Sequence, residues 1–325
     1  MMKNTSLTLF TKTIAATCAA ALLGTGVITG SALTATSVAA AQAANDNVFK
    51  QWGDAGLKAA DKQGMTTVKD VSLTQNGVTL GVSELMYDGI RLVMVLKVKG
   101  TTAKNVSFPT YLVDGQPLDR SITSSMMTVP KSAGESDDTL LIQFTDMIDQ
   151  GTGANLLPDE FELTLQTEVN DVKDAFTLPI PVKNIAKKRI ALQPKITKTE
   201  QKFSSSVLSL AMTSTTTLME VKSVGPIPSN AKIPKGNTAT KMYYDIADDR
   251  GEMLQPIKID IFNGKPLNEY QDKIVYPPVL SGAKFITVKP YTYSMDKKGK
   301  IMTDAKGKWV KFYHKALEMK IPVKA

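Results

Sequence analysis

The chain has 325 residues, with 42% hydrophobic and 22% charged side chains and a formal net charge of +8. A chain of this length is expected to form two domains. The single cysteine and single histidine exclude a disulfide framework and a metal site built from several such ligands, and they leave few means of nucleophilic or acid–base catalysis. We therefore predict no enzyme activity and no cofactor.

The first 43 residues predict export. Lys3 and Lys12 precede an uncharged run with an apolar centre at residues 14–28, and small residues then lead to Ala41-Gln42-Ala43. A basic start, an apolar centre and an Ala-x-Ala site are typical of a secretory signal peptide. A retained membrane anchor is the alternative, because the run is long enough to cross a bilayer. Either interpretation places the rest of the chain outside the cytoplasm, secreted or tethered to the outer face of the cell membrane.

Charge divides the remainder into two parts. Residues 44–189 contain 15 basic and 19 acidic side chains, a net charge of −4, whereas residues 190–325 contain 22 basic and 12 acidic ones, a net charge of +10. The change falls at a basic polar stretch, residues 183–189. We predict a domain boundary there, with a helix and β-sandwich domain at 44–189 and a basic immunoglobulin-like domain at 190–325.

One segment of the first part predicts a helix. Asp46 is a candidate N-cap for an amphipathic run, and Gly64 is a candidate stop. Gly53 and Gly56 inside this run lower its helix propensity. The helix is therefore expected to be short or broken and to depend on packing.

Beyond this helix the hydrophobic period changes to two. Residues 66–75, 78–87 and 90–99 predict a three-strand meander, since Asn76-Gly77 and Asp88-Gly89 suit type I′ hairpin turns.

In the third of these strands, Leu92, Met94 and Leu96 share one face, and Arg91 and Lys97 share the other. This alternation predicts a sheet with one buried face and one solvated face.

Short strands continue to the end of the chain. They are predicted at residues 106–113, 139–146, 161–169, 175–182, 207–210, 218–224, 241–247, 253–262, 283–293 and 315–323. Such spacing, with Gly, Pro and Asn between the strands, predicts a mainly β chain with two tandem immunoglobulin-like β-sandwich domains, the first with a short N-terminal helix.

Turn and core residues form a wider pattern, which comprises Phe49, Gly53-Asp54, Gly56-Leu57, Ala60, Gly64, Gly77-Val78-Thr79-Leu80 and Tyr87-Asp88-Gly89-Ile90-Arg91. This string resembles the extracytoplasmic domain of unknown function in membrane-bound sigma-factor regulators of Gram-positive bacteria. Ile196-Thr197, Asp248-Asp249-Arg250-Gly251 and Thr287-Val288-Lys289-Pro290-Tyr291 resemble the immunoglobulin-like domain that commonly follows it. The resemblance implies a membrane-associated, cell-surface protein. A cytoplasmic sigma-binding segment is not expected, because twelve residues precede the apolar run.

One histidine is a candidate catalytic residue, and one acidic group is a candidate calcium site. His314 lies in a cationic stretch without an evident orienting partner, so we expect a surface residue and no catalytic role. Asp245, Asp248, Asp249 and Glu252 offer oxygen ligands for calcium, but their spacing fits no EF-hand loop. An acidic β-turn is the favoured interpretation.

The basic C-terminal region predicts a face that binds an anionic polymer. Lysines and aromatic side chains alternate there, and a cationic surface with aromatic rings can hold polyanions. The candidate residues are Lys289, Tyr291, Lys297, Lys298, Lys300, Lys306, Lys308, Trp309 and Lys311. An anionic cell-wall polymer or membrane surface is the expected partner outside a cell, and nucleic acid is not. The alternative is a solvated lysine-rich loop at residues 296–308.

Two functions follow from these observations. The first is a non-catalytic exported cell-envelope protein that binds or senses an envelope component or a partner protein. The alternative is a secreted hydrolase whose carboxylates converge only in the folded chain. A deep cleft with two close acidic side chains favours the hydrolase, and a convex sandwich surface favours the binding protein.

Overall fold

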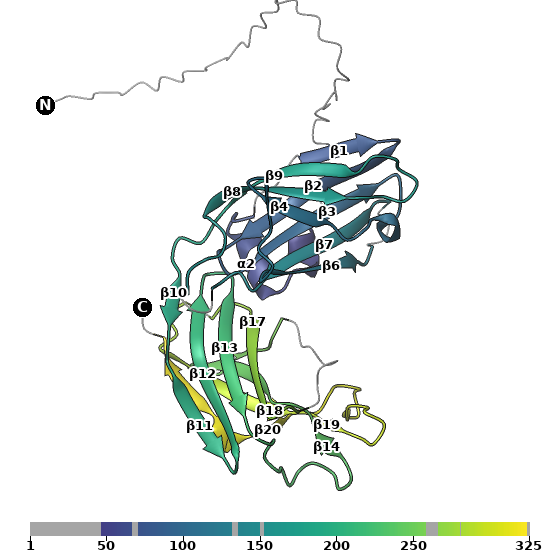
Figure 1. Cartoon of the computed structure of the whole chain (residues 1–325). Helices are drawn as coiled ribbons and strands as arrows, with labels where there is room; N and C mark the ends of the chain where they lie inside the picture. Colours follow the sequence, from purple (N-terminus) through teal and green to yellow (C-terminus); the bar gives the residue numbers. More distant parts are fainter. Residues whose placement is uncertain are drawn as a thin grey trace, which may run out of the picture. The chain divides into compact units, whose positions relative to one another are not determined.

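The computed structural model describes residues 47–66, 71–131, 136–149, 153–257, 266–279 and 281–323. The predicted leader at residues 1–43 lies outside these ranges. The described chain is mainly β, with antiparallel sheets and a pair of short N-terminal helices, which confirms the predicted fold class (Figure 1).

The predicted N-terminal helix is two helices, α1 (Val48–Trp52) and α2 (Ala55–Lys62). The backbone is extended at Gly53 and Asp54, and the Asp54 carboxylate accepts hydrogen bonds from the N–H groups of Gly56 and Leu57. Asp54 is therefore the N-cap of a new helix, which explains the break. The side chain of Asn47 caps α1; the predicted cap, Asp46, lies outside the described residues.

The first part of the chain forms two facing antiparallel sheets. One has the order β1-β2-β3-β7-β6 and the other β5-β4-β8-β9. The strands are β1 (Val71–Gln75), β2 (Val78–Tyr87), β3 (Leu92–Lys99), β4 (Thr110–Val113), β5 (Gln116–Pro117), β6 (Thr123–Val129), β7 (Asp138–Thr145), β8 (Glu160–Thr167) and β9 (Phe176–Lys183), with a 3-10 turn at Ala103–Asn105.

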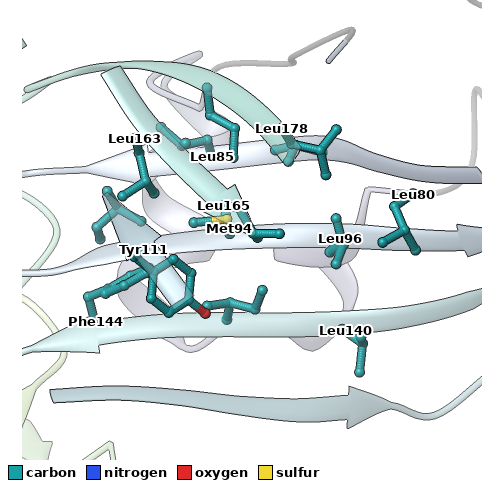
Figure 2. Packing of buried hydrophobic residues seen from close by; sticks show 14 of the residues in the cluster. Leu80, Leu85, Met94, Leu96, Tyr111, Leu140, Phe144, Leu163, Leu165 and Leu178 are labelled. Carbon is teal, nitrogen blue, oxygen red and sulfur yellow. The ribbon is translucent and has the colours of Figure 1, made fainter. Parts of the chain in front are cut away.

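The main core of this sandwich lies between its two sheets. Leu80 and Leu96 from one sheet and Leu165 and Leu178 from the other belong to one buried cluster (Figure 2). Alternate residues of each strand enter this cluster, as the period-two pattern predicts.

Part of the opposite face of the β1–β6 sheet is also buried, so the prediction of a solvated face is wrong for that part and holds at Lys99. Val93 and Val95 of β3 are fully buried and cluster with Phe49 and Leu57 of the two helices. The helices therefore form a third layer. The buried Glu84 of β2 fixes α1 on the sheet, because its carboxylate accepts hydrogen bonds from the first two N–H groups of that helix at 2.6 and 2.9 Å.

The two predicted hairpin turns differ. Asn76 and Gly77 both have positive φ, as a type I′ turn requires. At Asp88-Gly89 only the glycine does, and the type I′ prediction is wrong. The Asp88 carboxylate instead accepts hydrogen bonds from the N–H groups of Ile90 and Arg91, both at 2.9 Å, which stabilises a longer connection.

The second part of the chain also forms two larger sheets. One has the order β10-β12-β13-β17, with β11 beside β12, and the other β16-β15-β18-β20, with β21 beside β18. The strands are β10 (Ile190–Leu192), β11 (Ile196–Glu200), β12 (Phe203–Met212), β13 (Thr217–Val224), β14 (Thr238–Ala239), β15 (Tyr243–Asp248), β16 (Met253–Leu254), β17 (Glu269–Tyr276), β18 (Phe285–Thr292), β19 (Ser294–Met295), β20 (Phe312–Tyr313) and β21 (Met319–Pro322), with a 3-10 turn at Lys315–Leu317. A small sheet pairs β14 with β19.

A separate core fills this second sandwich. Phe203, Val221, Tyr244 and Val288 belong to one buried cluster. The described residues thus contain one sandwich core within residues 78–182 and another within residues 203–323. The domain limits at 44–189 and 190–325 stay predictions.

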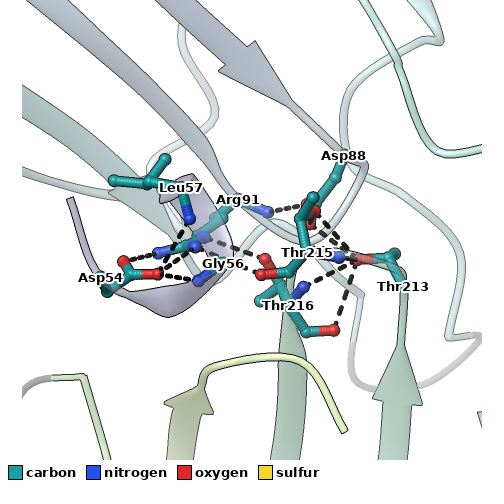
Figure 3. Close-up of polar contacts among 8 residues, drawn as sticks. All are labelled: Asp54, Gly56, Leu57, Asp88, Arg91, Thr213, Thr215 and Thr216. Atoms are coloured by element: carbon teal, nitrogen blue, oxygen red, sulfur yellow. Dashed lines mark hydrogen bonds and ion pairs between the residues drawn. The ribbon is translucent and has the colours of Figure 1, made fainter. Parts of the chain in front are cut away.

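A buried polar network connects α2, the β2–β3 connection and the β12–β13 turn; we call it the arginine junction (Figure 3). Arg91 is fully buried, although the strand pattern predicts it on a solvated face. Its guanidinium donates to both carboxylate oxygens of Asp54 at 2.7 and 3.0 Å, to the Thr216 hydroxyl at 2.9 Å and to the Thr215 carbonyl at 3.3 Å. Burial opposes ionisation of Asp54, yet the hydrogen bonds and charge of Arg91 lower the pKa of that carboxyl.

A second carboxylate completes the junction. Asp88 is buried, and its Oδ2 accepts hydrogen bonds from the hydroxyls of Thr213 and Thr215 at 2.8 and 2.6 Å. The charged groups of the junction are therefore partnered by protein groups, as buried charges require. The junction therefore ties α2 and the β2–β3 connection to the β12–β13 turn.

Candidate functional site

The predicted cationic face begins on the outer side of the β16–β20 sheet. Along β15, Tyr244 and Ile246 enter the core, so Tyr243 and Asp245 project to the opposite side. Tyr243 pairs with Tyr291 and Asp245 with Lys289 across β15 and β18. The outer side of this sheet thus brings tyrosines, a carboxylate and a lysine together.

Three tyrosines form an aromatic cluster on this side. The ring centroids of Tyr243, Tyr291 and Tyr293 lie 5.3–5.8 Å apart, and Ile301 packs with them. Tyr291, a predicted ligand-binding residue, is fully buried, so it supports the face from below and offers no contact surface. Burial raises the pKa of Tyr291 and Tyr293, which keeps both phenols neutral.

Two aromatic rings remain accessible beside the cluster. Trp309 is 47% exposed and lies 5.7 Å from the Tyr293 ring in an edge-on arrangement. Tyr313 is 38% exposed and lies 5.6 Å from the Tyr291 ring. These two rings, held by buried neighbours, are the aromatic surfaces that a ligand can contact.

Asp245 organises the polar part of the face. It is fully buried, and its Oδ2 accepts hydrogen bonds from the Lys311 ammonium and the Tyr313 hydroxyl, both at 2.7 Å. The same ammonium lies 4.4 Å from the centroid of the Tyr291 ring. The charge of Lys311 is therefore used within the protein, and this predicted binding residue positions Tyr313.

The alternative role of the acidic group as a calcium site finds no support in these contacts. Asp245 is paired with Lys311, and Asp248 accepts hydrogen bonds from the N–H groups of Arg250 and Glu252 within its own turn. Within the described ranges, no group of three or more His, Cys, Asp or Glu side chains could hold a metal ion.

Five lysines supply the free positive charge. Lys297, Lys298, Lys300, Lys306 and Lys308 are exposed, and among the residues that the structure describes no ion pair holds their ammonium groups. They lie in the same segment as Trp309, residues 294–310, which we call the lysine segment. Lys289 is half-buried, and its ammonium lies 6.0 Å from the centroid of the Tyr313 ring.

His314 differs from its prediction as a surface residue. Its side chain is buried, with Nδ1 3.2 Å from Glu200 Oε2 and Nε2 3.4 Å from the Thr292 hydroxyl. The order carboxylate, imidazole, hydroxyl is the order of a nucleophile-activating triad. However, Thr292 is fully buried, so a substrate has no access to its hydroxyl in this structure.

A hydrolase needs acidic side chains in a cleft. Asp146, Asp149 and Asp272 help to line a cavity of about 600 Å³. Lys273 lies 3.9 Å from an Asp146 oxygen, and Lys241 donates to Asp272 at 2.9 Å. Two of these carboxylates are thus paired with lysines. The cavity therefore brings three acidic side chains together, two of them as ion pairs with lysines.

Sequence reasoning missed two residues of the face, Tyr243 and Asp245. For Asp245, the sequence pattern indicates only a candidate calcium ligand. The alternation in residues 243–248 was the available signal, because it places Tyr243 and Asp245 on the side opposite to Tyr244 and Ile246.

Comparisons with known proteins agree with the fold. The sequence profile of a family described as a domain of unknown function (DUF4179) matches residues 8–100. A solved structure, described as the crystal structure of the conserved domain protein from Bacillus anthracis, is similar with a TM-score of 0.51 and 13% identity, over 80% of this chain and 92% of that one. No curated protein matches the chain. The similarity to the Bacillus structure concerns the fold alone.

Among the described residues, no helix has the length and apolarity needed to span a membrane.

Proposed function

We propose that the chain is a non-catalytic, exported protein of the cell envelope that binds an anionic envelope polymer through the lysine segment and the adjoining aromatic rings. The observation that carries this proposal is the group of five exposed lysines next to the exposed ring of Trp309, which have no ion pair with any residue in the described ranges. Free cations attract polyanions, and an aromatic ring provides an apolar surface for the uncharged part of such a chain.

The match of residues 8–100 supports the domain of unknown function, and the resemblance of the sequence adds the extracytoplasmic part of sigma-factor regulators as its proposed setting. A sensing role at the surface of a Gram-positive cell is therefore part of the proposal. The basic excess of residues 190–325, +10 against −4 for residues 44–189, agrees with an acidic partner for the second part of the chain.

The proposal predicts salt-sensitive binding to purified Gram-positive cell walls. Retention should fall several-fold between low and physiological ionic strength, because the Debye length shortens from about 30 Å at 0.01 M salt to about 8 Å at 0.15 M. Replacing the five lysines of the lysine segment by Gln should remove most of the retention at low salt. Cosedimentation with walls at a series of salt concentrations measures both effects.

A matched variant distinguishes a specific face from net charge. It replaces five exposed lysines elsewhere by Gln, at Lys50, Lys58, Lys62, Lys173 and Lys198. This control changes the net charge equally and should retain most of the binding. Equal losses in the two variants, or retention of the unmodified chain that does not depend on salt, would contradict the proposal.

A further inference from the structure

The lysine segment contains a short internal repeat. Residues 296–300 and 304–308 both read Asp-x-Lys-Gly-Lys, eight positions apart. In the first copy, the Asp296 carboxylate accepts hydrogen bonds from the N–H groups of Lys298 and Lys300 at 2.8 and 2.9 Å. The side chain at the first position of this copy thus holds the backbone of the turn.

The second copy has the same geometry. The Asp304 carboxylate accepts hydrogen bonds from the N–H groups of Lys306 and Lys308, again at 2.8 and 2.9 Å. The glycines have matching positive φ values, 77° at Gly299 and 75° at Gly307. We call the two copies the twin turns. In each turn, backbone N–H groups hold the carboxylate, the glycine adopts positive φ, and the lysine side chains are exposed.

The twin turns lie at opposite ends of a small meander. Met295 and Ile301 form one isolated antiparallel bridge, and Thr303 and Trp309 form another, so both turns share the segment at residues 300–304, which we call the middle strand. The N–H of Met302 donates to the Ser294 carbonyl at 2.9 Å, and that of Val310 donates to the Met302 carbonyl at 3.1 Å. At about 3.4 Å per residue, this strand separates the turns by roughly 14 Å.

The position of the meander explains why this separation is maintained. Ile301 of the middle strand packs with Tyr243 and Tyr293 of the aromatic cluster, and β19 pairs with β14 at its other side. Trp309 follows the second turn and contacts Tyr293. The two lysine groups are therefore held on a packed base and not on a free loop.

We propose that the twin turns form a bivalent site for a linear polyanion, with phosphodiester or polyphosphate charges repeated along one chain. This inference rests on the proposed function and specifies its ligand. A small anion can occupy one turn only, whereas a chain longer than the middle strand can occupy both. Linking two weak contacts in this way raises affinity by a factor of about 10² to 10⁴, because the second contact is intramolecular.

Binding of the full chain to polyphosphates of graded length tests the inference. The variants are K298Q/K300Q for the first turn, K306Q/K308Q for the second, and the combination. With long polyphosphate, each single-turn variant should lose at least tenfold in affinity, because removal of one turn removes bivalency. With pyrophosphate, which is too short to bridge the turns, each should lose about twofold or less. K58Q/K62Q, two exposed lysines of α2, is the control and should match the unmodified chain.

The outcomes separate this inference from the proposed function. If the unmodified chain binds long polyphosphate but each single-turn variant loses the same factor at every ligand length, bivalency is wrong and polymer binding stands. If no length binds, both proposals fail. A larger effect of the twin turns on anionic lipid vesicles than on long polyphosphate would contradict a polymer ligand.

Discussion

Replacing Arg91 by Met is expected to lower the free energy of unfolding by about 3 kcal/mol or more. The substitution removes the guanidinium that pairs with Asp54 and donates to Thr216, and it leaves the Asp54 carboxylate largely buried without its cation. Breaking a buried ion pair from one side costs about 3–5 kcal/mol, and the 18% exposure of Asp54 favours the lower end of that range. Urea unfolding followed by tryptophan fluorescence measures the change.

Lys99→Met is the matched control, because Lys99 lies exposed at the far end of β3, the strand that begins directly after Arg91. It should change stability by less than about 0.5 kcal/mol. The Arg91 effect should also depend on pH. Since Arg91 lowers the pKa of Asp54 below 3.8, its stabilising contribution is present above about pH 3.8 and is lost as the pH falls through the lowered value. The difference between R91M and the unmodified chain should therefore shrink in acid; a constant difference would contradict this account of the junction.

Replacing Gly56 by Ala is expected to produce the second large effect. A Cβ at this position would lie 1.9 Å from the Thr215 carbonyl oxygen and 2.8 Å from Arg91 Nη2. The methyl group cannot fit unless α2 moves away from the β12–β13 turn, which weakens the hydrogen bonds of the arginine junction. Overpacking of this kind costs about 1–3 kcal/mol and occasionally more, and we expect the upper part of that range despite the better helix propensity of Ala.

Gly81→Ala provides the comparison, because a Cβ there would lie no closer than 3.1 Å to another atom. Its loss should be clearly smaller. A double mutant adds a sharper test: because Gly56→Ala acts partly through Arg91, its cost should fall in the R91M background. Additive losses would show that the two substitutions act independently and would contradict a shared junction.

The sequence predicts most of the β-structure because local signals determine it. Period-two alternation and the Asn76-Gly77 turn predict β2 and most of the neighbouring strands, and these signals depend only on nearby residues. Two failures have a common cause in tertiary contacts. Arg91 has the residue type of a solvated position, but a carboxylate from α2 and a turn from the second part of the chain bury it. His314 is buried because Glu200 and Thr292 supply distant partners.

The candidate site was predicted in part. The five exposed lysines and Trp309 follow from composition, because charged residues near Gly turns are expected at the surface. The burial of Tyr291 and the pairing of Lys311 with Asp245 depend on the register between β15, β18 and β20, which one sequence does not specify. The repeat that defines the twin turns is visible in the sequence at a period of eight, but its meaning depends on the shared middle strand.

The proposed binding of an anionic envelope polymer can be measured on two preparations of cell walls. The full chain is incubated at low salt with intact Gram-positive walls and with walls from which phosphate-containing polymers have been removed, and the bound protein is quantified. We predict strong retention on intact walls and loss of most retention on stripped walls. Equal retention on both preparations, or release of soluble wall fragments during the incubation, would contradict the claim.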